Sequence, residues 1–89
     1  MDQRKMVLLA DASEEFRTLL REEIEKTGEF SVEVARDGNE VLKKVEERTP
    51  DLLVMDAMLA GLDGISVLRQ LQKQENGPMT ILTSGFVSG

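Results

Sequence analysis

Two aspartates each follow a run of apolar residues, and this placement makes them candidates for chemistry. Asp56 ends the apolar run 52–55, and Asp11 ends the apolar run 6–10. A carboxylate that directly follows a buried strand lies at the carboxyl edge of a sheet, where ligands bind in open α/β folds. Two such endings in one small domain predict a shared acidic site for a metal ion or a phosphoryl group.

Composition excludes several other kinds of site. The chain has 89 residues, a length typical of one domain, and it contains neither cysteine nor histidine. Disulfides, thiolate metal sites, a phosphohistidine on this chain and histidine-based triads are therefore excluded. The net charge of −6 and the lack of a long basic run argue against direct binding to nucleic acid.

The amino-terminal segment carries no sign of export or membrane insertion. Its apolar run, residues 6–10, is too short for the core of a signal peptide or for a membrane span. We therefore expect a cytoplasmic protein without membrane contact.

The elements that would position the two aspartates alternate between strands and helices. Residues 6–10 predict a buried strand, and Ser13 is a suitable cap for a helix over residues 14–26. The apolar residues of this helix recur at helical spacing: Phe16, Leu19, Leu20 and Ile24. Alternating residues 30–34 predict a half-exposed strand at a sheet edge.

The second half of the chain continues the pattern. Asp37 and Glu40 resemble a capping box before a helix that ends ahead of Thr49. The pattern then predicts a buried strand at 51–56 and a loop at 57–63. A helix over Ile65, Leu68 and Leu71 follows, capped by Asp63 or Gly64. The last element is an apolar, buried-looking strand at 79–83. This βαβαβαβ order predicts a parallel sheet with helices on both faces.

Four segments together resemble one family, the response-regulator receiver domain of two-component signalling. They are the turn Ala10-Asp11-Ala12-Ser13, the strand-end Asp56, the loop Leu62-Asp63-Gly64 and the ending Leu82-Thr83-Ser84. The likeness runs from Lys5 to about Ser84. Leu9-Ala10-Asp11 and Thr27-Gly28-Glu29-Phe30 further resemble the receiver half of stage 0 sporulation protein A-like regulators.

The resemblance implies a fold and a function. The fold would be a flavodoxin-like (CheY-like) doubly wound sheet of order 2-1-3-4, incomplete on its C-terminal side, with residues 1–89 as the N-terminal portion of the receiver domain. The function would be to take a phosphoryl group from a histidine kinase or phosphotransfer protein and to control an output domain absent from this chain. Such a module is not an enzyme, and it would meet DNA only through that output domain.

The resemblance also assigns roles to residues. Asp56 would accept the phosphoryl group, and Thr83 would hydrogen-bond a phosphoryl oxygen and couple it to a loop rearrangement. Mg²⁺ would be held by Asp11, Asp56 and the backbone carbonyl of Met58. Carboxylates can form acyl phosphates, and Mg²⁺ neutralises the transferring group.

Three departures from the family pattern bear on activity. Ala12 stands where the family has a second acid, the more direct metal ligand, which predicts weakened Mg²⁺ binding. Ala60 stands where the loop usually has proline. The chain also stops before the family's last strand and the lysine that pairs with the phosphoryl group.

Other interpretations remain open beside this one. Asp56 could be an ordinary turn residue, Asp11 a turn and capping residue, and Thr83 a residue that simply favours strands. The chain could be a degenerate receiver that works only in protein interaction or dimerisation. An aspartyl phosphatase is disfavoured because Met58 stands where a second acid is needed. The open edge 79–83 predicts a homodimer or a swapped association.

Overall fold

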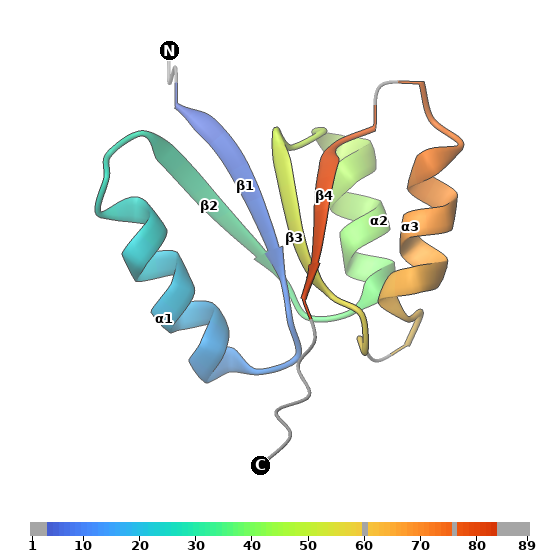
Figure 1. Ribbon diagram of the computed structural model, residues 1–89, viewed down its shortest axis with the longest axis horizontal. Coiled ribbons are helices and arrows are strands. Elements are labelled where there is room, and N and C mark those ends of the chain that lie inside the picture. Colours follow the sequence, from blue (N-terminus) through green and yellow to red (C-terminus); the bar gives the residue numbers. More distant parts are fainter. Residues whose placement is uncertain (1–3, 60, 76, 84–89) are drawn as a thin grey trace.

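Four strands and three helices alternate along the chain, as the sequence predicts. The structure is a computed structural model that describes residues 4–59, 61–75 and 77–83. The elements are β1 (Lys5–Ala10), α1 (Glu14–Glu25), β2 (Phe30–Ala35), α2 (Gly38–Glu47), β3 (Leu52–Asp56), α3 (Gly64–Gln72) and β4 (Met79–Thr83). All strand pairs are parallel and the order is β2-β1-β3-β4, which confirms the predicted flavodoxin-like topology (Figure 1).

Each helix begins after a polar residue that caps it. The side-chain oxygen accepts a hydrogen bond from the backbone N–H three residues on: Ser13 from Phe16 (3.1 Å), Asp37 from Glu40 (2.9 Å) and Asp63 from Ser66 (2.9 Å). The cap of α3 is therefore Asp63, while Gly64 is the first helical residue. The caps set where each helix starts after its strand. The starts of α1 and α3 lie beside Asp11 and Asp56, respectively.

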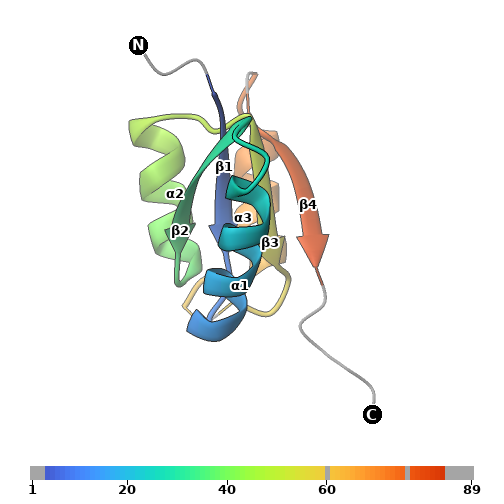
Figure 2. The same ribbon diagram turned by 90° about the vertical axis from the view of Figure 1, so that its left-hand side faces the viewer.

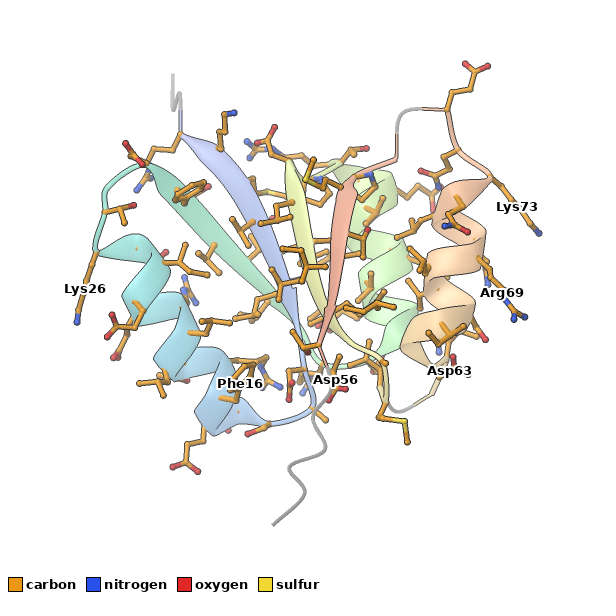
Figure 3. The ribbon with its side chains drawn as sticks, in the orientation of Figure 1. Phe16, Lys26, Asp56, Asp63, Arg69 and Lys73 are labelled. Atoms are coloured by element: carbon orange, nitrogen blue, oxygen red, sulfur yellow. The ribbon has the colours of Figure 1, made fainter. Side chains whose placement is uncertain are left out.

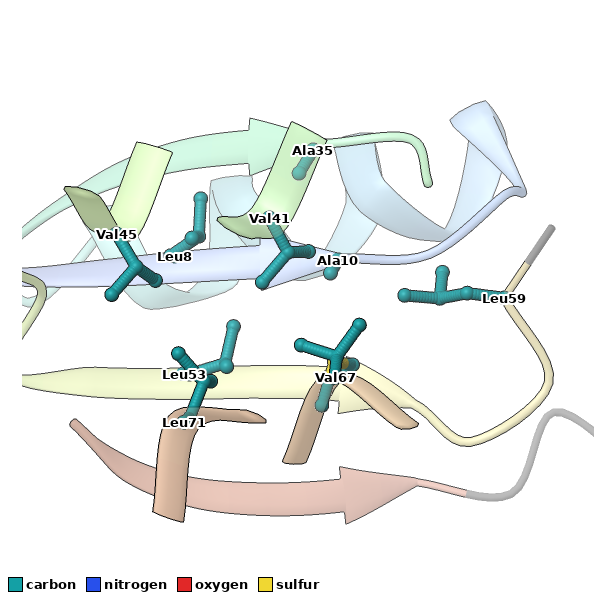
Figure 4. Close-up of a cluster of buried hydrophobic side chains, with 10 residues drawn as sticks. Leu8, Ala10, Ala35, Val41, Val45, Leu53, Leu59, Val67 and Leu71 are labelled. Atoms are coloured by element: carbon teal, nitrogen blue, oxygen red, sulfur yellow. The ribbon is translucent and has the colours of Figure 1, made fainter. Parts of the chain in front are cut away.

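One face of the sheet is covered by two helices. Helices α2 and α3 pack there over a cluster of buried side chains from β1, β2, β3 and both helices (Figure 4). The cluster consists of Leu8, Ala10, Ala35, Val41, Val45, Leu53, Met55, Leu59, Val67 and Leu71. This face holds most of the apolar core.

The opposite face is covered only in part. Helix α1 lies over β2 and β1, with Leu20 and Ile24 packed against the buried Val7, Leu9 and Val32 (Figures 1 and 2). No described helix covers β3 and β4 on this side, and Met79 and Ile81 of β4 are 73% and 50% exposed.

Two sequence-based expectations are therefore wrong in detail. The strand 79–83 is not buried, and the predicted apolar face of α1 includes Leu19, which is 60% exposed, and Phe16, which is also exposed. The apolar residues of α1 that pack against the sheet are Leu20 and Ile24. The apolar pattern of the sequence predicts which residues are apolar on this side of the sheet. It does not predict which of them stay exposed, because the single helix α1 cannot cover them all.

Candidate functional site

Asp56 occupies a corner formed by the end of β3 and the start of α3. Its side chain is 7% exposed, and its Oδ1 accepts a hydrogen bond of 2.9 Å from the N–H of Met58. A Cβ atom at Gly64 would lie 2.4 Å from the carbonyl oxygen of Asp56, so only glycine fits there. The N–H of Gly64 also donates to the carbonyl of Ala57 at 3.1 Å. Asp56 lies at the lower edge of the sheet in Figure 3.

Asp11 lies at the same edge, after β1. It is 7% exposed, and its Oδ1 accepts a hydrogen bond of 2.8 Å from the N–H of Ser13. The preceding Ala10 is paired with Met55, the residue before Asp56. Because neighbouring strands run about 4.8 Å apart, Asp11 and Asp56 occupy adjacent positions at the ends of their two strands. The structure thus places the two predicted carboxylates at one edge of the sheet.

Thr83 ends the neighbouring strand beside Asp56. The two residues are partners in the β3–β4 register, and the N–H of Ala57 donates to the carbonyl of Thr83 at 3.0 Å. Thr83 is half-buried. Three strand ends therefore bring Asp11, Asp56 and Thr83 to the same edge.

Met58 differs from the other predicted site residues because its side chain is exposed. Its N–H holds the carboxylate of Asp56, whereas the metal-binding role of its backbone carbonyl stays a prediction. Ala12 is exposed and contributes no carboxylate. Two positions that bear on the family resemblance, Ala60 and Ser84, lie outside the described residues.

Arg17 is a charged residue of this region that the sequence reasoning missed. It is 8% exposed, and its Nη1 donates a hydrogen bond to the backbone carbonyl of Asp11. A signal for it exists in the sequence, because Arg17 falls at helical spacing with Leu20 and Ile24 on the face of α1 that packs against the sheet. A charged residue within an apolar face indicates a specific partner, which here is a backbone oxygen beside the acidic site.

The donor set suits Mg²⁺ better than a metal that needs a complete cage of protein ligands. Mg²⁺ is usually held by one or two carboxylates together with waters and substrate phosphates. Asp11 and Asp56 supply two buried carboxylates at one edge. Within the part of the chain that the structure describes, no group of three or more acidic, histidine or cysteine side chains could hold a metal ion. The residues therefore fit a two-carboxylate Mg²⁺ site.

The family comparison agrees with this geometry. The family described as response regulator receiver domain matches residues 7–88 of the chain. The finer likeness to stage 0 sporulation protein A-like regulators stays a prediction. Separately, none of the helices in the described ranges is long and apolar enough to span a membrane.

Two named proteins match the chain in sequence, and a solved receiver domain shares its fold. The chain is 44% identical over 81 residues to the alkaline phosphatase synthesis transcriptional regulatory protein PhoP of Bacillus subtilis, covering 90% of this chain and 33% of that protein. It is 40% identical over 79 residues to protein-glutamate methylesterase/protein-glutamine glutaminase 5 of Myxococcus xanthus, covering 88% of this chain and 23% of that protein. The chain thus spans about a third or less of these curated relatives. A solved receiver domain, that of Francisella response regulator 1452, superposes with a TM-score of 0.85 at 33% identity, covering 96% of this chain and 69% of the other.

Proposed function

Because the chain belongs to the family of response regulator receiver domains, we propose that Asp56 is its phosphoacceptor. The observation that carries this proposal is the placement of Asp56 at the carboxyl edge of β3, next to Asp11 and paired with Thr83. Its Oδ1 is oriented by the N–H of Met58. A buried, oriented carboxylate at this edge is suited to attack a phosphoryl group that arrives from solvent.

The phosphoryl donor would be a phosphohistidine of a histidine kinase or a phosphotransfer protein. A carboxylate oxygen of Asp56 forms the new P–O bond while the P–N bond of the phosphohistidine breaks. The departing imidazole nitrogen keeps the electron pair of that bond and takes up a proton. The product is an aspartyl phosphate on this chain and a free histidine on the donor.

Asp11 and Asp56 would hold the Mg²⁺ ion of such a site, with the carbonyl of Met58 as a further ligand. When bound, Mg²⁺ neutralises negative charge on the transferring phosphoryl group. Because Ala12 supplies no carboxylate, we expect weaker metal binding than in receivers with two consecutive acids. Asp11 then carries a larger share of metal binding.

Thr83 would report the phosphoryl group to the rest of the domain. Its pairing with Asp56 supports this role, since a hydroxyl at this strand end can donate a hydrogen bond to a phosphoryl oxygen.

The test is intact-mass measurement after incubation with Mg²⁺ and acetyl phosphate. We expect the wild-type chain to gain one phosphoryl group and Asp56→Asn to gain none. Asp63→Asn is a matched control, because Asp63 is an exposed aspartate whose capping role asparagine can fill. It should be phosphorylated like the wild type. A folded wild-type protein that gains no mass, or an Asp56→Asn variant that gains as much, would contradict the proposal.

A second function, interaction independent of phosphorylation, is favoured by the exposed strand β4. The strand contains no charged residue, and Met79 and Ile81 project apolar surface from it. Uncharged, apolar edge strands tend to pair with other chains. We propose that a second copy of this chain, docked or swapped, pairs with β4.

Light scattering over a range of concentrations tests this association. The wild type and Asp56→Asn should both form dimers, and Ile81→Lys should be monomeric because a charge on an edge strand opposes pairing. Leu19→Lys is the control, since Leu19 is an exposed apolar residue of α1 rather than of the edge. A wild-type chain that stays monomeric at high concentration would exclude this second function.

DNA binding is proposed only for a separate output domain. The net charge of −6 opposes contact of these residues with DNA. The transcriptional regulatory relative is about three times as long as the matched region, which leaves room for such a domain in that protein. For the residues themselves we propose a cytoplasmic phosphoacceptor with no enzymatic turnover of its own, since Met58 stands where a phosphatase of this kind needs an acid.

A further inference from the structure

Arg17 is one of three buried charged residues among those that the structure describes. The other two are Asp11 and Asp56 of the candidate site. Burying a charged side chain is unfavourable unless hydrogen bonds compensate it. Hydrogen bonds must therefore compensate the burial of the Arg17 guanidinium, and the carbonyl oxygen of Asp11 accepts one of them.

The turn after β1 is held at two points around Asp11. The N–H of Ser13 donates to the carboxylate of Asp11 at 2.8 Å, and Arg17 Nη1 donates to its carbonyl oxygen. Arg17 itself is fixed in the first turn of α1, where its N–H donates to the carbonyl of Ser13 at 3.0 Å. The side chain of Arg17 thus ties the strand-end turn that carries Asp11 to the helix that follows it.

We propose that Arg17 is a positioning residue for Mg²⁺ binding at Asp11. The inference rests on the proposed function, because it concerns the metal of the same site. Ala12 is exposed and carries no carboxylate, so Asp11 is the one buried carboxylate at this edge besides the phosphoacceptor among the described residues. A site with so few ligands depends strongly on the orientation of each. Loss of a group that orients a metal ligand typically costs about 10–100-fold in metal affinity or activity. Arg17 acts through the backbone carbonyl of Asp11, so we expect an effect at the lower end of this range.

A competing electrostatic account makes the opposite prediction. A fixed positive charge beside the site would repel Mg²⁺, so its removal would tighten binding. Lysine keeps the charge but lacks the planar fork of the guanidinium, whereas methionine keeps much of the buried volume and loses both charge and donors. The pair of variants Arg17→Lys and Arg17→Met therefore separates positioning from charge.

The experiment is a Mg²⁺ titration of the ¹⁵N-labelled full chain, following the amides of Ser13 and Met58, together with amide hydrogen exchange of Ser13 without metal. We expect Arg17→Met to bind Mg²⁺ about 10-fold more weakly and to exchange the Ser13 amide faster, with Arg17→Lys in between. Arg21→Met is the matched control, because Arg21 lies one turn further along α1 and its exposed side chain pairs with Glu25 at 3.4 Å. It should match the wild type in both measurements.

Phosphorylation by acetyl phosphate adds a readout that a purely structural role would not give. In Arg17→Met the rate should fall at low Mg²⁺ and return toward the wild-type rate at saturating Mg²⁺. A variant that is merely less stable would show a lower melting temperature and an unchanged Mg²⁺ dissociation constant for the folded protein. If Arg17→Met does not fold, Arg17→Lys carries the comparison, because it keeps the charge and can still donate hydrogen bonds from its ammonium group.

The inference and the proposed function fail in different ways. A wild type that binds Mg²⁺ but is not phosphorylated overturns the proposed function, while the Arg17 comparison still stands on the titration and on hydrogen exchange. Unchanged Mg²⁺ affinity and unchanged Ser13 exchange in folded Arg17 variants overturn the inference. Tighter binding in Arg17→Met, with Arg17→Lys equal to the wild type, also overturns it in favour of charge repulsion.

Discussion

The two faces of the sheet are built differently although the same strands supply both. On one face α2 and α3 enclose a cluster of ten buried apolar residues. On the other face α1 covers β2 and β1, the cluster holds three buried apolar residues, and the one buried residue of α1 is Arg17. Figures 1 and 2 show β4 without a helix on this second side.

The two faces therefore contribute differently: one mainly stabilises the fold, and the other helps to organise the acidic site. Apolar burial contributes roughly in proportion to the area removed from water, so the covered face supplies most of the hydrophobic stabilisation. The α1 face contributes less burial and instead ties Asp11 to a helix through Arg17. We therefore expect substitutions on the covered face to change the free energy of unfolding. Substitutions on the α1 face near Asp11 should instead change the geometry of the acidic site.

The largest effect should come from matched leucine truncations on the two faces. Leu71 of α3 is buried, whereas Leu19 of α1 is exposed, and both lie in helices. Leu71→Ala should lower the free energy of unfolding by about 2–5 kcal/mol because it leaves a cavity. Leu19→Ala should change it by no more than about 0.5 kcal/mol. Urea unfolding followed by circular dichroism measures both.

Similar losses in the two variants would break the comparison. They would mean that Leu19 is covered in solution, for example by a second copy of the chain. Repeating the unfolding at several protein concentrations distinguishes the cases, because stabilisation by a partner depends on concentration.

A smaller but more local effect is expected at Gly64, on the covered side of Asp56. A Cβ there would lie 2.4 Å from the backbone oxygen of Asp56, so Gly64→Ala must displace the start of α3 or the end of β3. We expect a loss of about 1–3 kcal/mol, as for other overpacked positions, and slower phosphorylation by acetyl phosphate.

Gly28→Ala is the control for this substitution. Gly28 has a φ of 76°, and a Cβ atom added there would meet nothing within 4 Å, so alanine strains only the backbone, far from the acidic edge. It should lower stability without changing the phosphorylation rate of the folded protein. Equal phosphorylation of Gly64→Ala and the wild type would show that the position of α3 does not set the geometry of Asp56.

Much of the fold could be predicted because each element has a local signal. Apolar runs located the strands before Asp11 and Asp56, and short polar residues located the starts of the helices. The parallel pairing of the strands followed from their alternation with helices, whereas the strand order 2-1-3-4 was implied by the family resemblance. These signals lie within a few residues of the element they specify.

The remaining features depend on contacts between distant elements. Helical periodicity grouped Leu19 with Leu20, but only the packing of α1 on β1 and β2 decides which of the two is covered. Helical spacing places Arg17 on the same side of α1 as Leu20 and Ile24, but its partner, the backbone carbonyl of Asp11, is set only by the way the strand-end turn folds. The close approach of Gly64 to Asp56 likewise depends on the path of the loop between them.

The smallest predicted effect concerns pH and compares the caps of the two faces. The hydrogen bond from the backbone N–H of Ser66 lowers the pKa of Asp63 below its ordinary value of 3.8. The serine that caps α1 does not titrate in this range, so the α1 cap is insensitive to acid. Of the caps of α1 and α3, only that of α3, on the covered face, should weaken as the pH falls.

The sign of the effect follows from the direction of this shift. A carboxyl group with a lowered pKa in the folded state stabilises the fold when ionised. Its contribution is complete above the unfolded pKa near 3.8 and is lost as the pH falls through the lower folded value. Asp63→Asn keeps the capping oxygen but cannot titrate, so its urea midpoint should fall slightly less than that of the wild type between pH 6 and about pH 3. Parallel losses in the two proteins would mean that the ionised form of Asp63 adds nothing beyond what a neutral cap supplies.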